Sequence, residues 1–434
     1  MSDPPTPLSA RRPDPDEGRR FQQDVAWNMV GYALMGVCGI LLNVLIGIFY
    51  DPATLGVFNQ VFAIYILFSQ FAALGIHYST LKHVAEAGAD ARASSHVIAG
   101  TLIPTFILSL ASTVVMLACR EWIGQLLSEE VARGIAWASV GLFFFGINKV
   151  LLGAINGLNW MRAFAVLQAL RPVLIVAGVM VMSAGGAPAE SLPAAMSAAE
   201  AVLFAVCLGL LVVRGYLKGP FHDLLGWGLT HVNFGIRGFA SGILVELNTR
   251  VDVLLLGYFS DNRTVGVYSF AAILAEGVYQ ILVVLRNVYS PLVVARRRER
   301  DEQALGRLIR RGKIGTYLAT AVVGGAAILL YPVAIGLVGA SANYARGWPV
   351  FATLMTGIVL IAGYVPFSNV LLLAGRPGMH TLLMLLVTVV NVAGNMLLIP
   401  FWGAQGAAVA TAFSFVFLAG MLIVMARRTV GIRL

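Results

Sequence analysis

Charged side chains that could bind an ion or an anionic group lie inside apolar stretches of this 434-residue chain. Glu246 and Arg250 are four residues apart and share one face of a helix, and Asp252 follows closely. A charge inside a membrane is costly, so such a group faces a partner or a watery cavity. Two interpretations of Glu246 and Arg250 therefore stay open: the two neutralise each other, or they line a cavity.

A second constellation begins thirty residues after Glu246. Glu276, Tyr279 and Gln280 stand at helical spacing, and Arg286 and Asn287 continue the same side. Lipid does not tolerate such a polar stripe, so this side must face protein or water. The other ionisable residues inside apolar stretches are Lys149, Arg171, Glu200 and Arg237.

The surrounding segments have the composition of a membrane protein. Hydrophobic residues make up 59% of the chain and charged residues 12%, about half of what soluble domains carry. A membrane helix needs roughly 20 apolar residues. We predict an all-α polytopic membrane protein with twelve spans, at 25–49, 56–80, 96–118, 134–155, 163–183, 194–214, 233–257, 265–290, 314–338, 348–373, 379–400 and 404–426.

The positive charges predict how the spans are oriented. With the N-terminus inside, the inner segments hold 21 of the 30 Lys and Arg residues, and the outer segments hold Arg120, Arg133, Arg263 and Arg346. This bias predicts that both termini are cytoplasmic. The net charge of +9 is thus a topology signal, and the basic run 296–313 is interpreted as an anchor for anionic lipid rather than a nucleic-acid site.

A repeated motif explains the even number of spans. Asp51 to Phe58 and Asp261 to Tyr268 agree as D-x-x-T-(L/V)-G-V-(F/Y). Both copies occupy the outer loop after the first span of a six-span unit. We predict that Asp51 and Asp261 cap the following helices and that Gly56 and Gly266 permit close packing, a structural role rather than a catalytic one.

Six spans per unit give both units the same orientation, which makes them parallel repeats. The predicted organisation is a disordered cytoplasmic tail (1–24), an N-lobe of helices 1–6 (25–218), a cytoplasmic linker (219–232) and a C-lobe of helices 7–12 (233–434). Two like lobes that face each other enclose a cleft, and their rocking opens it to either side. This is the architecture of a transporter.

Several kinds of chemistry have no signature in the sequence. There is no phosphate-binding loop for ATP, no H-E-x-x-H motif, and no spacing among Cys38, Cys119 and Cys207 that indicates a disulfide or metal site. We therefore expect no cofactor, no metal, no catalytic residue and no nucleic-acid partner.

The repeat and its surroundings resemble a known group of proteins. The residues that carry the resemblance are "VDVLLLGYF" (251–259), "D-x-x-T-V-G-V-Y-S-F-A" (261–271), "NGLNWMRAF" (156–164) and "GAQGAAVATAFS" (403–414). They resemble the multidrug/oligosaccharidyl-lipid/polysaccharide (MOP) exporter superfamily, and within it the Wzx-type polysaccharide and O-antigen flippases of bacterial inner membranes.

The resemblance implies a V-shaped pair of lobes that work by alternating access. It also implies a substrate of undecaprenyl diphosphate bearing an oligosaccharide, moved from the cytoplasmic to the periplasmic leaflet for cell-surface polysaccharide biosynthesis. Arg suits a diphosphate because its planar fork makes paired hydrogen bonds. The substrate-binding candidates are Arg250, Arg286, Arg171, Lys149, Glu246 and Glu276, and the candidates for ion or proton coupling are Glu246, Asp252 and Glu276.

Three functions are compatible with this pattern. The leading one is a monomeric flippase in the inner membrane, with membrane lipids around it and a polysaccharide polymerase or other assembly proteins as partners. The second is a cation-coupled multidrug exporter, which a net anionic cavity would favour. The third is a membrane enzyme that polymerises or transfers sugars, and the short outer loops count against it.

Overall fold

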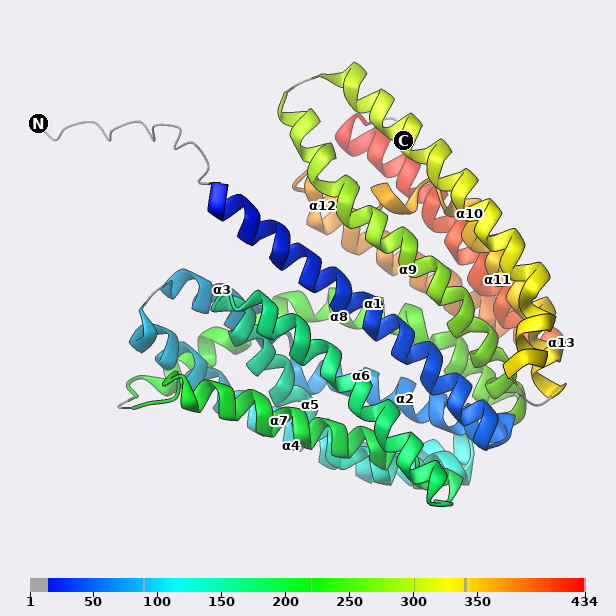
Figure 1. The fold of residues 1–434 in the computed structure, drawn as a ribbon, viewed down its shortest axis with the longest axis horizontal. Coiled ribbons are helices and arrows are strands. Elements are labelled where there is room, and N and C mark those ends of the chain that lie inside the picture. The colour runs from blue at the N-terminus through cyan, green and yellow to red at the C-terminus, as the bar shows by residue number, and fades with distance from the viewer. Residues whose placement is uncertain (1–14, 89, 220, 300, 339–341, 433–434) are drawn as a thin grey trace, which may run out of the picture.

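A computed structural model describes residues 15–88, 90–219, 221–299, 301–338 and 342–432, and within them the chain forms helices and no strand (Figure 1). The α-helices are α1 (Pro15–Phe49), α2 (Pro52–Ala73), α3 (Ile76–Ala87), α4 (Ala91–Leu126), α5 (Glu129–Gly157), α6 (Met161–Ala184), α7 (Ala194–Val213), α8 (Leu224–Phe259), α9 (Asn262–Arg298), α10 (Glu302–Val338), α11 (Trp348–Ile361), α12 (Val370–Leu373) and α13 (Pro377–Met425). Short helical turns cover Ala189–Ser191, Ala342–Gly347, Val365–Phe367 and Ala426–Val430.

These helices correspond to the twelve predicted spans. In the described part of the chain, ten segments are long and apolar enough to cross a membrane. One of them is α13, which covers the last two predicted spans and kinks at Gly403. The ten segments thus account for eleven predicted spans. The twelfth is α8, which has 36 residues and carries Arg237, Glu246, Arg250 and Asp252.

The boundaries differ from the prediction at several places. Helix α8 begins at Leu224, within the predicted linker 219–232, and the predicted span 348–373 is divided into α11 and α12. Helix α1 begins at Pro15, so residues 15–24 of the predicted disordered tail are helical, and residues 1–14 lie outside the described residues. The second predicted span is split into α2 and α3. Leu74 and Gly75 have positive φ angles (40° and 71°), and this interrupts the helix between α2 and α3.

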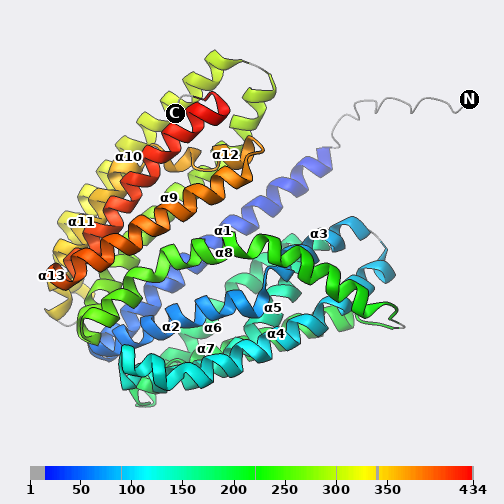
Figure 2. The same cartoon turned by 180° about the vertical axis from the view of Figure 1, so that it is seen from behind.

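The helices form two bundles that meet at one end and separate at the other (Figure 1). Helices α2 to α7 make the N-lobe and α9 to α13 make the C-lobe, while α1 runs diagonally between them (Figures 1 and 2). We call the two ends of the molecule the closed end and the open end.

Buried apolar residues explain this V shape. At the closed end one core takes side chains from both lobes, for example Leu55 and Val61 with Val265 and Tyr268. Toward the open end each lobe has a separate core. The core of the N-lobe lies around Leu151, and the core of the C-lobe lies around Leu371. Because burial of apolar surface drives association, the lobes are held together only where they share a core.

Two glycines of the repeated motif make the closest contact between the lobes. A Cβ atom added to Gly56 of α2 would lie 1.8 Å from the Asn262 carbonyl oxygen, and one added to Gly266 of α9 would lie 1.7 Å from the Pro52 carbonyl oxygen. Real Cβ atoms never approach an oxygen so closely. The motif therefore lets the first turns of α2 and α9 cross backbone to backbone, which we call the glycine crossing.

The aspartates of the motif begin these two helices. Asp51 accepts hydrogen bonds from the backbone nitrogen and the hydroxyl of Thr54, both at 2.9 Å, and Asp261 accepts one from the Thr264 backbone nitrogen at 2.7 Å. Hydrogen bonds from the Thr264 side chain and backbone lower the pKa of Asp261. The outer carboxylate oxygen of Asp51 lies 3.5 Å from Arg263, so the caps also join the lobes.

The glycine crossing should be intolerant of any side chain. We expect Gly266→Ala to lower the free energy of unfolding by about 1–3 kcal/mol, the usual cost of forcing extra volume into a packed contact. The thermal unfolding temperature of purified protein measures this. Gly420→Ala is the matched control, because nothing lies within 4 Å of its added Cβ. Equal unfolding temperatures for the two variants would contradict the crossing.

Candidate functional site

An ion pair is buried inside the N-lobe. Arg171 Nε on α6 lies 2.6 Å from Glu200 Oε1 on α7. The Glu200 side chain is 1% exposed, and its other oxygen accepts a hydrogen bond of 2.8 Å from Asn148 Nδ2 on α5. The Asn148 amide also donates to the Glu200 backbone carbonyl at 2.9 Å. Arg171 is thus neutralised within its own lobe.

Sequence reasoning placed Arg171 in the candidate site and left Glu200 and Asn148 out. The partner of Arg171 is 29 residues away in the next helix, so no helical spacing connects the two. The signal available was Glu200 itself, a lone acid in an apolar span. The structure assigns this pair to the interior of the N-lobe.

Lys149 lies beside this pair and has no ion-pair partner among the described residues. Its ammonium group sits 5.1 Å from the centre of the Phe145 ring, and the Arg171 guanidinium lies 4.3 Å from the same ring. The charges of Glu246 on α8 and of Arg171 both act on it. Lys149 therefore presents a cation between the N-lobe and α8.

The i,i+4 ion pair of α8 does not form. No ion pair joins Glu246 and Arg250, although both residues are described and half-buried. Arg250 instead lies 5.1 Å from the centre of the Phe62 ring on α2, and its Nε is buried without a hydrogen bond. Of the two interpretations left open by the sequence, mutual neutralisation is not the one seen in this structure.

The polar stripe of α9 is also unpaired. Among the described residues neither Glu276 nor Arg286 makes an ion pair, and Arg286 Nε is buried without a hydrogen bond. Arg286 acts electrostatically on His380 of α13, and both Glu276 and Arg286 act on Tyr279. Stripe residue Tyr279 stacks on Phe415, with ring centres 5.7 Å apart.

Asp252 occupies a different environment from Glu246 and Glu276. It is 9% exposed, accepts a hydrogen bond from the Val253 backbone nitrogen, and accepts another from the Tyr268 hydroxyl of α9. No cation pairs with it in the described part of the chain. Tyr268 also interacts with Thr411 of α13, so three helices of the C-lobe meet at this carboxyl group.

Polar side chains of α13 contact α8 one and two helical turns before Asp252. Asn391 Nδ2 donates to the Asn248 carbonyl at 3.1 Å, and Asn395 Nδ2 donates to Asn391 Oδ1 at 2.8 Å. The Thr388 hydroxyl contacts the Leu244 carbonyl at 3.4 Å. These contacts fix the second half of α8 to the C-lobe.

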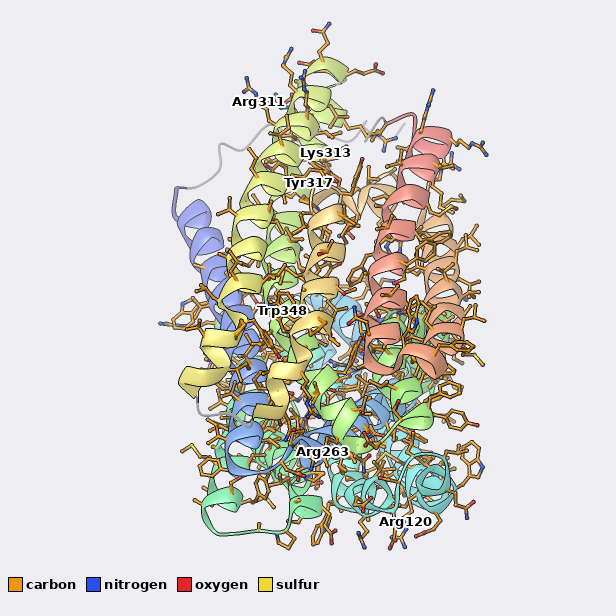
Figure 3. All side chains as sticks on the ribbon, turned by 90° about the vertical axis from the view of Figure 1, so that its right-hand side faces the viewer. Arg120, Arg263, Arg311, Lys313, Tyr317 and Trp348 are labelled. Atoms are coloured by element: carbon orange, nitrogen blue, oxygen red, sulfur yellow. The ribbon has the colours of Figure 1, made fainter. Side chains whose placement is uncertain are left out.

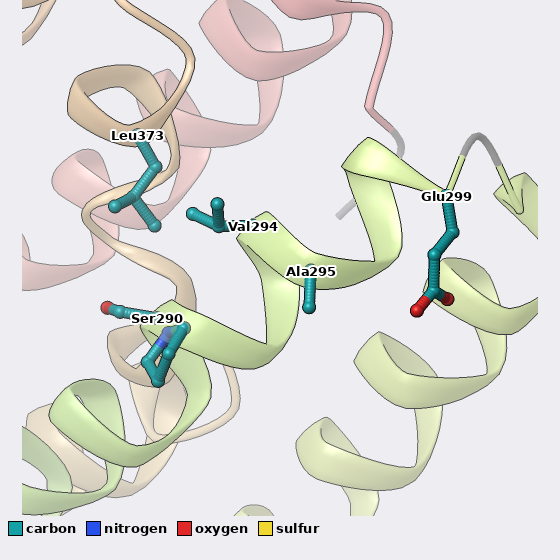
Figure 4. A pocket seen from close by; sticks show the side chains of 6 residues that line it. Ser290, Val294, Ala295, Glu299 and Leu373 are labelled. Carbon is teal, nitrogen blue, oxygen red and sulfur yellow. The ribbon is translucent and has the colours of Figure 1, made fainter. Parts of the chain in front are cut away.

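A separate hollow lies near the open end of the C-lobe (Figure 4). It measures about 490 Å³ and is lined by Ser290, Pro291, Val294, Ala295, Glu299 and Leu373, from the end of α9 and from α12. A smaller hollow of about 330 Å³ adjoins it and reaches Arg297 and Ile432. Neither of these two hollows contains a predicted site residue.

The basic run predicted to anchor the chain lies at one end of the molecule. Arg311 and Lys313 are at the opposite end from Arg120 and Arg263 (Figure 3). Lys313 packs 4.0 Å from the centre of the Tyr364 ring, and Arg296 binds Glu299 at 2.8 Å with both side chains about half exposed.

Comparison with known proteins now decides the family. The profile of the family described as polysaccharide biosynthesis protein matches residues 21–295, well over half of the chain. The chain belongs to this family. No curated protein matches the chain as a relative.

Solved structures show the fold of this family member. An inward closed conformation of the lipid II flippase MurJ is 12% identical, with a TM-score of 0.75 over 92% of this chain and 87% of that one. An inward-facing multidrug resistance MATE transporter of the MOP superfamily is 16% identical, with a TM-score of 0.74 over 94% and 97%. A MOP transporter from Pyrococcus furiosus is 14% identical, with a TM-score of 0.63 over 92% of each chain.

The family match agrees with the predicted superfamily, and the solved structures confirm the V-shaped pair of helical lobes. Each matched structure just described is a flippase or a transporter, and the chain shares their fold.

The Arg171–Glu200 pair should stabilise the N-lobe. Removing one partner of a buried ion pair typically costs about 3–5 kcal/mol, because the other charge stays buried and unpaired. We expect Glu200→Gln to lower the thermal unfolding temperature strongly, and Arg171→Met together with Glu200→Gln to recover most of the loss. A double variant no more stable than Glu200→Gln would show that the two residues do not act as a pair.

Proposed function

We propose that this family member is a flippase for undecaprenyl-diphosphate-linked oligosaccharide. It moves this lipid from the cytoplasmic to the periplasmic leaflet of a bacterial inner membrane by alternating access, in the service of cell-surface polysaccharide biosynthesis. The oligosaccharide that we propose is a unit of a surface polysaccharide such as an O-antigen.

The main support is a set of three cations that have no ion-pair partner among the described residues. Lys149 on α5, Arg250 on α8 and Arg286 on α9 are in this position, whereas Arg171 is neutralised by Glu200. Glu246, Glu276 and Asp252 have no cation partner either, but Asp252 is buried within the helices against Tyr268, so three cations remain against two acids. Such an excess suits an anionic diphosphate better than an organic cation, since charge of opposite sign lowers the cost of burying both groups.

The shape of the molecule gives a second line of support. The lobes are joined by the glycine crossing at one end and separate at the end that carries the basic run (Figure 1). A MATE transporter matches with a TM-score of 0.74 inward-facing and another MATE structure with 0.64 outward-facing. We infer that the open end is cytoplasmic, as are both termini, and that the lobes follow the predicted division at 25–218, 219–232 and 233–434.

A leaflet assay tests the function. The protein is placed in vesicles with a fluorescent undecaprenyl-diphosphate-linked sugar, and the accessibility of that lipid to an impermeant quencher is followed. We expect Arg250→Ala and Arg286→Ala each to slow transbilayer movement about tenfold to a hundredfold, since a lost charge-assisted hydrogen bond is worth about 1.5–3 kcal/mol.

The control for this assay is Arg237→Ala, because Arg237 lies on the same helix as Arg250 but is exposed. The Arg237→Ala variant should move the lipid across the bilayer at the rate of the unaltered protein. If no such lipid moves with folded, oriented protein, the flippase proposal is wrong and the multidrug exporter becomes the leading function. If movement persists in both Arg variants, the flippase stands and the assigned phosphate site is wrong.

We also propose Asp252 as the coupling group for an ion or proton, ahead of Glu246 and Glu276. Its carboxyl group is buried where α8, α9 and α13 meet and has no cation partner in the described chain. Asp252→Asn keeps the shape of this group and the hydrogen bond from Val253, lets its amide nitrogen donate to the Tyr268 oxygen, and removes the charge. We expect movement of the lipid to continue while a proton or sodium gradient no longer accelerates it. A variant that responds to both gradients as the unaltered protein does would exclude Asp252.

The proposed partners are the lipid-linked oligosaccharide, the membrane lipids around the chain and a polysaccharide polymerase or other assembly proteins. The proposed oligomeric state is a monomer, because both halves of the cleft come from one chain.

A further inference from the structure

Helix α8 crosses from one lobe to the other. Its second half is fixed to the C-lobe through Asn248, but its first half lies along α3 and α4 of the N-lobe (Figure 2). A Cβ atom added to Gly235 would lie 2.2 Å from the Leu74 carbonyl oxygen, and one added to Gly100 of α4 would lie 2.4 Å from Trp227 Cβ. The first half of α8 is therefore docked against the N-lobe at backbone distance.

A buried histidine lies at the centre of this docked surface. His231 of α8 is 0% exposed. Its Nδ1 lies 2.8 Å from the Ser79 hydroxyl of α3, and its ring stacks on Trp227 with centres 5.6 Å apart. The Val97 carbonyl of α4 acts on the ring, while Nε2 makes no full hydrogen bond.

A second histidine shares the same serine. His83 Nδ1 lies 2.8 Å from the Ser79 carbonyl oxygen and 3.2 Å from the Ser79 hydroxyl. Because a carbonyl only accepts, His83 Nδ1 carries a proton and donates it. The Ser79 hydroxyl is then free to donate to His231 Nδ1. This arrangement requires a neutral His231, and the two imidazole centres are only 5.5 Å apart.

The neighbouring charges do not compensate a positive imidazole. From α3, Lys82 lies 5.4 Å from the Phe234 ring centre and is occupied by Glu86 at 3.7 Å, with both side chains exposed. From α4 the Val97 carbonyl contacts His231. From α8 the neighbours are uncharged rings, Trp227 beside His231 and Phe234 beside His83. Among the described residues, His83 is the titratable group that acts on His231, and its effect is repulsive.

We propose that His83 and His231 form a proton-binding site that latches the first half of α8 to the N-lobe. With both imidazoles neutral the helix stays docked. A proton on His231 places an uncompensated charge in the contact, and α8 separates from α3. Since α8 also belongs to the C-lobe, its release loosens the two lobes near the open end.

The direction of the pH effect follows from burial. Burial, with His83 second, lowers the pKa of His231 from its ordinary 6.5 to about 4. The released helix therefore binds protons more tightly than the docked one, so docking is favoured above pH 6.5 and weakens as pH falls toward 4. Between pH 7.5 and 5.0 we expect the docking equilibrium to shift by about 30-fold, since each pH unit below 6.5 contributes about tenfold.

A distance measurement on the full chain tests the latch. Ala85→Cys and Leu229→Cys place spin labels on exposed positions of α3 and α8, in a background with Cys38, Cys119 and Cys207 replaced. We expect one short distance at pH 7.5 and a growing population of longer distances as pH falls to 5.0. His231→Phe should keep the short distance at both pH values, because phenylalanine fills the site without titrating.

His231→Gln is the second variant, to be used if His231→Phe does not dock at pH 7.5, because glutamine does not titrate either. His96→Asn is the control, since His96 stacks on His222 in a separate histidine pair of the same lobe, and it should respond to pH as the unaltered protein does. A distance that is independent of pH, or one that shifts equally in both latch variants, would overturn the proposal. The measurement uses no transported lipid, so its outcome is separate from that of the flippase proposal.

Discussion

The rest of the structure depends on the backbone contact between Gly56 and Gly266. Because neither residue has a side chain, α2 and α9 cross closely enough for one apolar core to include residues of both lobes at that end. Away from the crossing the lobes keep separate cores. The lobes thus share a core at the crossing, and the first half of α8 makes a second close contact with the N-lobe. Asp51 and Asp261 cap α2 and α9 at the crossing. One short motif, present twice, therefore determines where both helices begin and where the lobes meet.

The distribution of charge follows from this geometry. Inside a lobe an ionised group must find its partner, as Arg171 does in Glu200. Between the lobes a group can stay unpaired because the space is open to water or substrate. Arg250 and Arg286 come from the two helices that flank the motif, and each has a buried Nε without a hydrogen bond. In the proposed flippase these unpaired cations bind the anionic cargo.

Much of the fold could be predicted from the sequence because its signals are local. Apolar length gives the spans, the repeat gives the two parallel lobes, and an aspartate three residues before a threonine gives each cap. The pairing of Arg171 with Glu200 and the docking of α8 on the N-lobe could not be predicted, since both are contacts between helices distant in sequence. The break at Leu74 also escaped prediction, because leucine gives no local warning of a positive φ angle.

The most direct measurement of the account locks the closed end and follows transport. Asp51→Cys and Arg263→Cys replace a pair whose side chains lie 3.5 Å apart across the lobes, in a background without the native cysteines. A short cross-linker attached through disulfide bonds joins them, and a reducing agent removes it. The account predicts that cross-linking stops the transbilayer movement of an undecaprenyl-diphosphate-linked sugar and that reduction restores it. Movement that continues at full rate with the lobes locked would contradict the account.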